Sequence, residues 1–147
     1  MKPVFEIAPE AIFFQQTNLI CEVCAGGFSY VFANETDKKF HGLSVFYFTG
    51  DVDVSEQLKT IFKEQPLFHK NYKKVFVSYS GEESALLPEE LHKTGEDELL
   101  LDTLYGDLKH DSIATDHIPE KKTYNVYRML AAVRQVIVDK FPLAVFK

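Results

Sequence analysis

The feature that most restricts the fold of this chain is a pair of short apolar runs separated by two glycines. Residues 18–24 and 28–33 are rich in residues that favour β-strands, and Ala25-Gly26-Gly27 joins them. Paired glycines tolerate the positive φ angles that a tight hairpin demands. A polar turn then leads to a third run, 40–48, with the alternation of a strand. These runs predict a three-stranded antiparallel meander.

A helix is predicted directly after the meander. Asp53 is placed to be its N-cap, and Glu56 at the third helical position completes the pattern of a capping box. The helix is expected to end near Gln65, because Pro66 follows. Its apolar residues recur at helical spacing: Val54, Leu58, Ile61 and Phe62.

The middle of the chain predicts a strand over 74–79, then a turn at 80–82. Residues 84–88 indicate a further strand, either a hairpin partner of the previous one or a short extended segment. Pro88 is suited to the first position of a helix. Acidic residues followed by leucines over 89–106 predict a helix, or two short helices, ending near Gly106.

Two strands, 111–118 and 122–127, are expected on either side of a turn at Pro119-Glu120. The last long element, 126–141, predicts a helix because one broad face gathers Met129, Leu130, Val133, Val136 and Ile137. The predicted fold class is therefore α+β or α/β. It consists of the meander followed by helix-strand-helix-strand-helix, in one domain over residues 1–147.

Charge and composition exclude several classes of partner. The chain carries a formal net charge of −6 with a pI near 5.3, which disfavours binding to a nucleic-acid backbone. Its longest basic cluster, 70–74, is interpreted as a solvated loop leading into a strand. No stretch approaches the roughly 20 apolar residues that span a bilayer, and 1–16 does not resemble a signal peptide. We expect a cytoplasmic protein that does not bind membranes.

Cys21 and Cys24 are the only cysteines, and they satisfy the Cys-x-x-Cys pattern. Residues three apart on a strand point to opposite faces, so the two sulfurs would diverge. A redox pair needs converging sulfurs at a helix N-terminus, and a zinc site needs two further ligands. The interpretation that we favour is two buried strand cysteines. A redox or metal protein using both remains an alternative.

Other chemistry-bearing residues form no known motif. The histidines are scattered singly, at 41, 69, 92, 110 and 117, and no serine lies in a nucleophile elbow or a phosphate-binding loop. The acidic run 96–98 lacks the alternating oxygen ligands of a calcium loop and is interpreted as the charged start of a helix. The sequence therefore predicts no catalytic residue, no metal site and no cofactor, and leaves any cofactor-binding residues unknown.

Three segments carry a resemblance to a known family. Leu19-Ile20-Cys21 leading to 27–30, the segment 84–91, and Phe141-Pro142 look like an uncharacterised Bacteroidetes family known as domain of unknown function 3822 (DUF3822). Members have an actin-like (ribonuclease H-like) fold. The resemblance covers about residues 15–142 and implies that this chain corresponds to one half of such a fold.

The resemblance also implies where a nucleotide would meet the chain. ATP-binding actin-like proteins carry Asp-x-Gly in the first hairpin, and setting Gly26 under that glycine places Cys24 where the metal-directing Asp would be. Phe28 would bring bulk where phosphates need room. The final residues, 143–147, are expected to start a strand of the missing half. An unpaired half would expose an apolar face and should dimerise or bind another protein.

These observations lead to a hypothesis and a rival. The hypothesis is a non-catalytic protein with a partial actin-like fold that acts through protein–protein association, with itself as a homodimer or with another protein. The rival is a degenerate ATP-binding protein whose cleft is completed by a second copy or a partner.

Overall fold

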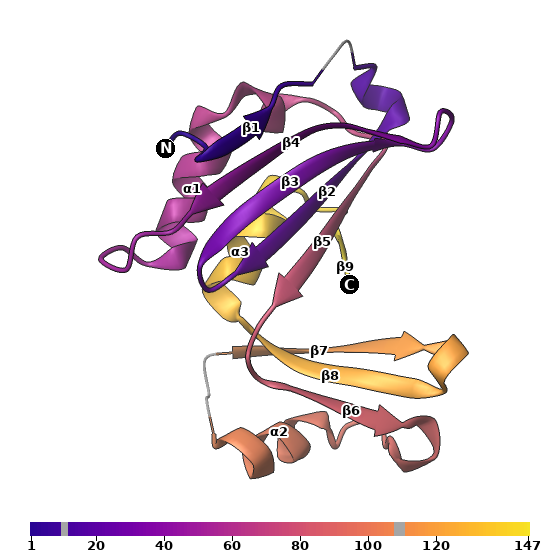
Figure 1. Cartoon of the computed structure of the whole chain (residues 1–147). Coiled ribbons are helices and arrows are strands. Elements are labelled where there is room, and N and C mark those ends of the chain that lie inside the picture. The colour runs from indigo at the N-terminus through magenta and orange to yellow at the C-terminus, as the bar shows by residue number, and fades with distance from the viewer. Residues whose placement is uncertain (10–11, 108–110) are drawn as a thin grey trace. The chain divides into compact units, whose positions relative to one another are not determined.

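The computed structural model describes residues 1–9, 12–107 and 111–147, and it divides the chain into two compact units. Unit 1 consists of Met1–Ser80 and Gln135–Lys147, and unit 2 consists of Gly81–Arg134. Figure 1 draws the whole chain. The single domain expected over 1–147 stays a prediction. No helix in the described ranges is long and apolar enough to cross a membrane.

Unit 1 is built on a six-stranded sheet. Its strands are β1 (Phe5–Ile7), β2 (Thr17–Cys24), β3 (Gly27–Asn34), β4 (Lys39–Tyr47), β5 (Lys74–Ser80) and β9 (Val145–Phe146), in the order β1-β4-β3-β2-β5-β9. β2, β3 and β4 form the predicted antiparallel meander. β5 lies parallel to β2 on the side away from β3. The carboxyl ends of two parallel strands therefore meet beside the β2–β3 turn.

The first helix, α1 (Val54–Glu64), confirms the prediction made from its spacing and its cap. A side-chain oxygen of Asp53 accepts a hydrogen bond from the Ser55 backbone N–H at 2.8 Å, which satisfies one of the free donors at the helix start. Glu56, in the first turn of the helix, pairs with Lys59 at 2.6 Å. Short 3₁₀ helices lie at Phe14–Gln16 and Pro66–His69.

An aromatic cluster packs the helices of unit 1 onto one face of the sheet. Phe28 of β3 meets Phe62 of α1 edge to face, with ring centroids 5.6 Å apart. Phe62 in turn contacts Phe68 at 4.9 Å and Phe141 at 5.6 Å, and Phe141 directly follows α3 (Ala131–Lys140). Tyr30 contacts Phe68 at 4.9 Å. These rings fill the core between the sheet, α1 and the end of α3.

The opposite face of the sheet carries an apolar row that crosses all six strands. Residues paired in register point to the same side of a sheet, and the pairs join Ile7, Leu43, Val31, Ile20, Phe76 and Val145. Ile7 and Val145 are exposed, and the other four are half-buried. Figure 1 shows α1 and α3 on one side of this sheet. We call the other side, defined by this row, the open face.

Unit 2 contains a three-stranded antiparallel sheet and one α-helix. The strands are β6 (Ser84–Pro88), β7 (Asp111–Ile118) and β8 (Thr123–Leu130), in the order β6-β8-β7, and the helix is α2 (Asp97–Tyr105). Short 3₁₀ helices lie at Glu89–Leu91 and Pro119–Lys121. The Arg128 side chain, 3% exposed, is held by Glu83 at 2.8 Å and by Asp102. Both carboxylates compensate a guanidinium that would be costly to bury alone.

The helix predicted over 126–141 is wrong in its first part. Val126–Leu130 form the end of β8, and α3 begins at Ala131. In this strand Val126, Tyr127 and Met129 are buried, and the strand pairs with β6 and β7 on its two sides. Apolar residues buried on both faces of a central strand leave no period-2 alternation, so the spacing alone also fits a helix.

Three further expectations are corrected. Pro88 is the last residue of β6 and does not open a helix. β6 pairs with β8, so it is not a hairpin partner of β5. Val145–Phe146 do not begin a strand of a missing half, because β9 lies parallel to β5 in the same sheet. The N-terminal strand β1, paired with β4, was not predicted because only three residues take part.

The glycines of the β2–β3 turn are needed for a different reason from the one expected. Neither Gly26 nor Gly27 has a positive φ. A Cβ atom built on Gly27 would lie 2.4 Å from the Phe46 carbonyl oxygen, whereas one on Gly26 would meet nothing within 4 Å. Gly27 therefore permits the close approach of β3 to β4, and Gly26 has no such role.

Alanine should lower the stability of the protein at Gly27 but have little effect at Gly26. Gly27→Ala is expected to lower the free energy of unfolding by about 1–3 kcal/mol, because backbone must shift to relieve the clash. Gly26→Ala is expected to stay within about 1 kcal/mol of the wild type. Urea unfolding followed by circular dichroism measures both. Equal midpoints for the two variants would contradict the close approach.

Candidate functional site

The strongest candidate for a ligand site in unit 1 surrounds the β2–β3 turn. A cavity of about 290 Å³ lies there, lined by residues of β2, β3 and β4 that include Glu22, Cys24, Ser29 and Tyr47. The register places these side chains on the open face, since Glu22 pairs with Ser29 and Cys24 with Gly27, and Gly27 with Tyr47. Ligands of open α/β sheets bind outside the carboxyl ends of parallel strands. The cavity lies beside the carboxyl ends of the parallel strands β2 and β5.

Glu22 supplies the carboxylate of this cavity. It is exposed on β2, and Ser80 at the end of β5 donates a hydrogen bond from Oγ to Glu22 Oε1 at 3.2 Å. Sequence comparison with the Asp-x-Gly pattern drew attention to Cys24 and missed Glu22. The signal available in the sequence was the two-residue spacing, because residues two apart on a strand share a face.

Phe28 is among the residues that line this cavity, but its ring packs in the core, contrary to the expectation. Its side chain is 2% exposed and contacts Phe46, Phe62 and Phe68 in the aromatic cluster. Phe28 is in register with Val23, which is also fully buried, and not with a residue of the open face. The space in front of the turn glycines is therefore not taken by the phenyl group.

The two cysteines take opposite faces of the strand, as its geometry predicts, but the expected burial is correct only for Cys21. Cys21 is buried on the face that packs against the helices, whereas Cys24 is half-buried beside the turn and its Sγ lies 3.5 Å from the Gly27 carbonyl oxygen. Burial raises the pKa of the Cys21 thiol far above its ordinary value. In the described part of the chain, no group of three or more His, Cys, Asp or Glu residues is arranged to hold a metal ion.

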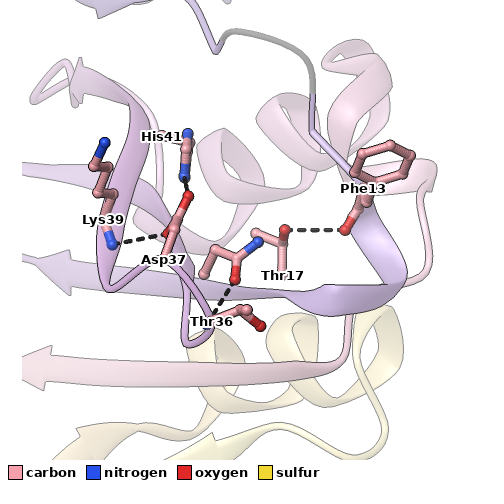
Figure 2. Close-up of polar contacts among 7 residues, drawn as sticks. Phe13, Thr17, Thr36, Asp37, Lys39 and His41 are labelled. Atoms are coloured by element: carbon pink, nitrogen blue, oxygen red, sulfur yellow. Dashed lines mark hydrogen bonds and ion pairs between the residues drawn. The ribbon is translucent and has the colours of Figure 1, made fainter.

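The polar residues of the β3–β4 turn hold the turn itself. Figure 2 shows Asp37 accepting a hydrogen bond from the Lys39 backbone N–H at 3.0 Å and pairing with His41 at 2.6 Å. The Thr36 backbone N–H donates to Asn34 Oδ1 at 2.8 Å in the same way. Such contacts are typical of Asx turns. The Asp37–His41 pair is therefore accounted for by the local fold.

The other residues considered in the sequence also have local contacts. Asp97 pairs with His92 at 2.9 Å and accepts from Thr115 Oγ1 at 2.9 Å, at the start of α2. His117 lies 3.4 Å from Glu89. The rings of His92 and His117 both stack on Tyr124. His110 lies outside the described residues.

Comparison with solved structures gives the fold. The chain superimposes, with a TM-score of 0.88 and 18% identity, on a crystal structure from Bacteroides thetaiotaomicron described as a protein with an actin-like ATPase fold and unknown function. The match covers 93% of this chain and 55% of that one, so this chain spans about half the length of its neighbour. It therefore has the actin-like fold over the matched part.

Sequence comparison gives the family. The family model described as "Protein of unknown function (DUF3822)" matches residues 11–147. Among the curated proteins there is no match. The resemblance noticed in the sequence is confirmed in both its parts, the family and the fold.

The two cysteines should differ sharply in reactivity. The thiolate is the nucleophile, and Cys21 is both buried and held in its thiol form, so iodoacetamide is expected to modify Cys24 at least about tenfold faster in the folded protein. Peptide mass spectrometry follows both sites, Cys24→Ser isolates the slow one, and both should react alike in concentrated urea. Equal rates in the folded protein would contradict the buried position of Cys21.

Proposed function

This chain belongs to the DUF3822 family, and we propose that it is a non-catalytic cytoplasmic protein that acts by association, with the open face of its sheet packed against a second copy of itself. The observation that carries the proposal is the apolar row across all six strands. Five spacings of about 4.8 Å between neighbouring strands make this row about 24 Å long. A standard interface buries about 800 Å² on each partner, and a row of this length would extend across most of such an interface.

Further apolar side chains extend the row on the same face. Phe5 is in register with Val45, and Tyr47 lies at the end of β4; Phe5 and Tyr47 are 52% and 68% exposed. Contiguous exposed apolar surface of this kind marks interaction sites in soluble proteins. Two copies related by a two-fold axis can pack identical apolar faces against each other, because hydrophobic contact is not directional. A second copy is therefore the simplest partner.

The non-catalytic part of the proposal rests on the residues at the β2–β3 turn. Position 24, where the resemblance places a metal-directing aspartate, is a cysteine. A thiol near a carbonyl oxygen does not replace a carboxylate in directing magnesium, which prefers oxygen ligands. The cytoplasmic part is supported by the two cysteines, both free in this fold, as expected in a reducing compartment.

The association is tested by substitutions at exposed positions of β1. Phe5→Glu/Ile7→Glu places two charges in the proposed interface, and burying them is expected to weaken dimerisation at least about tenfold. Leu99→Glu in unit 2, also at an exposed apolar residue, is the control and should leave dimerisation unchanged. Sedimentation velocity over a dilution series measures the effect. A wild-type chain that stays monomeric at every concentration would overturn the proposal.

A specific observation favours a second candidate, the degenerate ATP-binding protein. Phe28 leaves the turn free, and Glu22 places a carboxylate two residues before Cys24 on the same face. In this candidate Glu22 directs the magnesium ion, and the backbone at Gly26 and Gly27 approaches the phosphates. A second copy or a partner supplies the other wall of the cleft.

Thermal unfolding with Mg-ATP tests this second candidate. A ligand at one hundred times its Kd adds about 2.7 kcal/mol to the free energy of unfolding, so Mg-ATP should raise Tm. Glu22→Gln should abolish the rise, while Glu120→Gln in unit 2 should preserve it. The absence of any rise in the wild type, with or without dimerisation, would reject the ATP-binding candidate and leave the association proposal standing.

A further inference from the structure

A second cavity of unit 1, larger than the one at the turn, lies at the opposite end of β5. It has a volume of about 640 Å³ and lies between the segment 68–75 and the segment 140–145. This volume is within the range of small-molecule sites. β5 begins at Lys74, inside the first segment, and ends at Ser80 beside the turn. The cavity therefore belongs neither to the β2–β3 site nor to the apolar row as a whole, of which only Val145 reaches it.

The lining of this cavity is basic, in a chain that is acidic overall. Lys70, Lys73, Lys74 and Lys140 line it together with His69, and none of the described residues that line it is acidic. The chain as a whole has 22 acidic residues and a net charge of −6. The sequence interpretation of 70–74 as an exposed loop leading into a strand is correct. That interpretation did not include Lys140, which lies at the end of α3 and lines the same cavity.

The contacts of these lysines show which charges are available to a ligand. Lys73 pairs with Glu35, and Lys74 also lowers the pKa of that carboxyl. Lys70, in contrast, holds its Nζ 5.9 Å from the centre of the Phe14 ring. The contact does not neutralise the ammonium charge, and Phe14 lines a neighbouring cavity that Lys70 also borders.

Lys140 is held by a neutral partner. Its Nζ donates to His69 Nδ1 at 3.3 Å. The Lys63 carbonyl oxygen accepts from His69 Nε2 at 3.2 Å, so the proton of the neutral ring lies on Nε2 and the lone pair on Nδ1 faces Lys140. This arrangement orients the ammonium group and leaves its charge without a carboxylate among the contacts of the described residues.

Apart from Asn71 and Tyr72, the remainder of the lining is apolar. The rings of Phe68 and Phe141 are buried and lie 6.2 Å apart, at the floor. Leu143 also lines the cavity, and its side chain is 92% exposed, which is unusually high for a leucine. An apolar body of a ligand would cover Leu143 and gain from its burial.

We propose that this cavity binds an amphipathic anion, a phosphate or carboxylate group carried on a short apolar body. Lys70 and Lys140 pair with the anion, and the apolar body lies over Leu143 and the phenylalanine floor. The site shares only Val145 with the apolar row of the proposed dimer interface and lies away from the turn, so it does not rest on either candidate function.

Four probes separate the two parts of the ligand. Octyl phosphate and octanoate carry both parts, inorganic phosphate carries only the anion, and 1-octanol carries only the apolar body. Isothermal titration calorimetry on the full chain, below the micelle concentration, should show at least about tenfold tighter binding of one or both amphipathic anions than of the two partial probes. The stronger of the two amphipathic probes then identifies phosphate or carboxylate as the headgroup.

Variants locate the binding. Lys70→Gln/Lys140→Gln should weaken the preferred probe at least about tenfold, and Leu143→Gln should weaken it while leaving binding of inorganic phosphate unchanged. Lys93→Gln/Lys121→Gln in unit 2 removes the same charge and should have no effect. If the double variant fails to fold, Lys140→Gln alone replaces it. Binding that is unaffected by the cavity lysines, equal binding of 1-octanol, or no binding of any probe would overturn the proposal.

Discussion

The edge-to-face contact between Phe28 and Phe62 determines much of what this chain can do. It fixes α1 to one face of the six-stranded sheet, and Phe68 and Phe141 extend the same cluster to the end of α3. Two consequences follow from this one arrangement. The apolar residues of the other face are left to find a partner elsewhere, and the side chain of Phe28 is drawn away from the turn, so that Glu22 and Cys24 face a cavity there.

Local patterns in the sequence were sufficient wherever an element is held by its own neighbours. The meander follows from alternation and from a two-residue turn, and α1 follows from its cap and its apolar spacing. The error at 126–130 has a different origin, because consecutive residues of this segment, Val126 to Met129, are all buried. Burial on both faces removes the alternation by which a strand is recognised, so no local rule would separate it from a helix.

The same distinction between local patterns and distant packing applies to the candidate sites. Cys21 and Cys24 were placed correctly because strand geometry alone decides which face each sulfur takes. Phe28 was misplaced because a motif alignment says which residues follow a turn but not which face they point to. The basic cavity could not be anticipated, since Lys140 and Lys70 are far apart in the chain and line one cavity only in the folded unit.

The discontinuity of unit 1 has a consequence for how the protein is made. Its first part ends at Ser80, and its second part, which supplies Phe141 and β9, begins only at Gln135. During synthesis on the ribosome the N-terminal strands emerge first, whereas the ring that completes the aromatic core emerges only after the whole of unit 2. Until then one side of the sheet lacks part of its cover, and nascent chains present an incomplete core for as long as unit 2 is being translated.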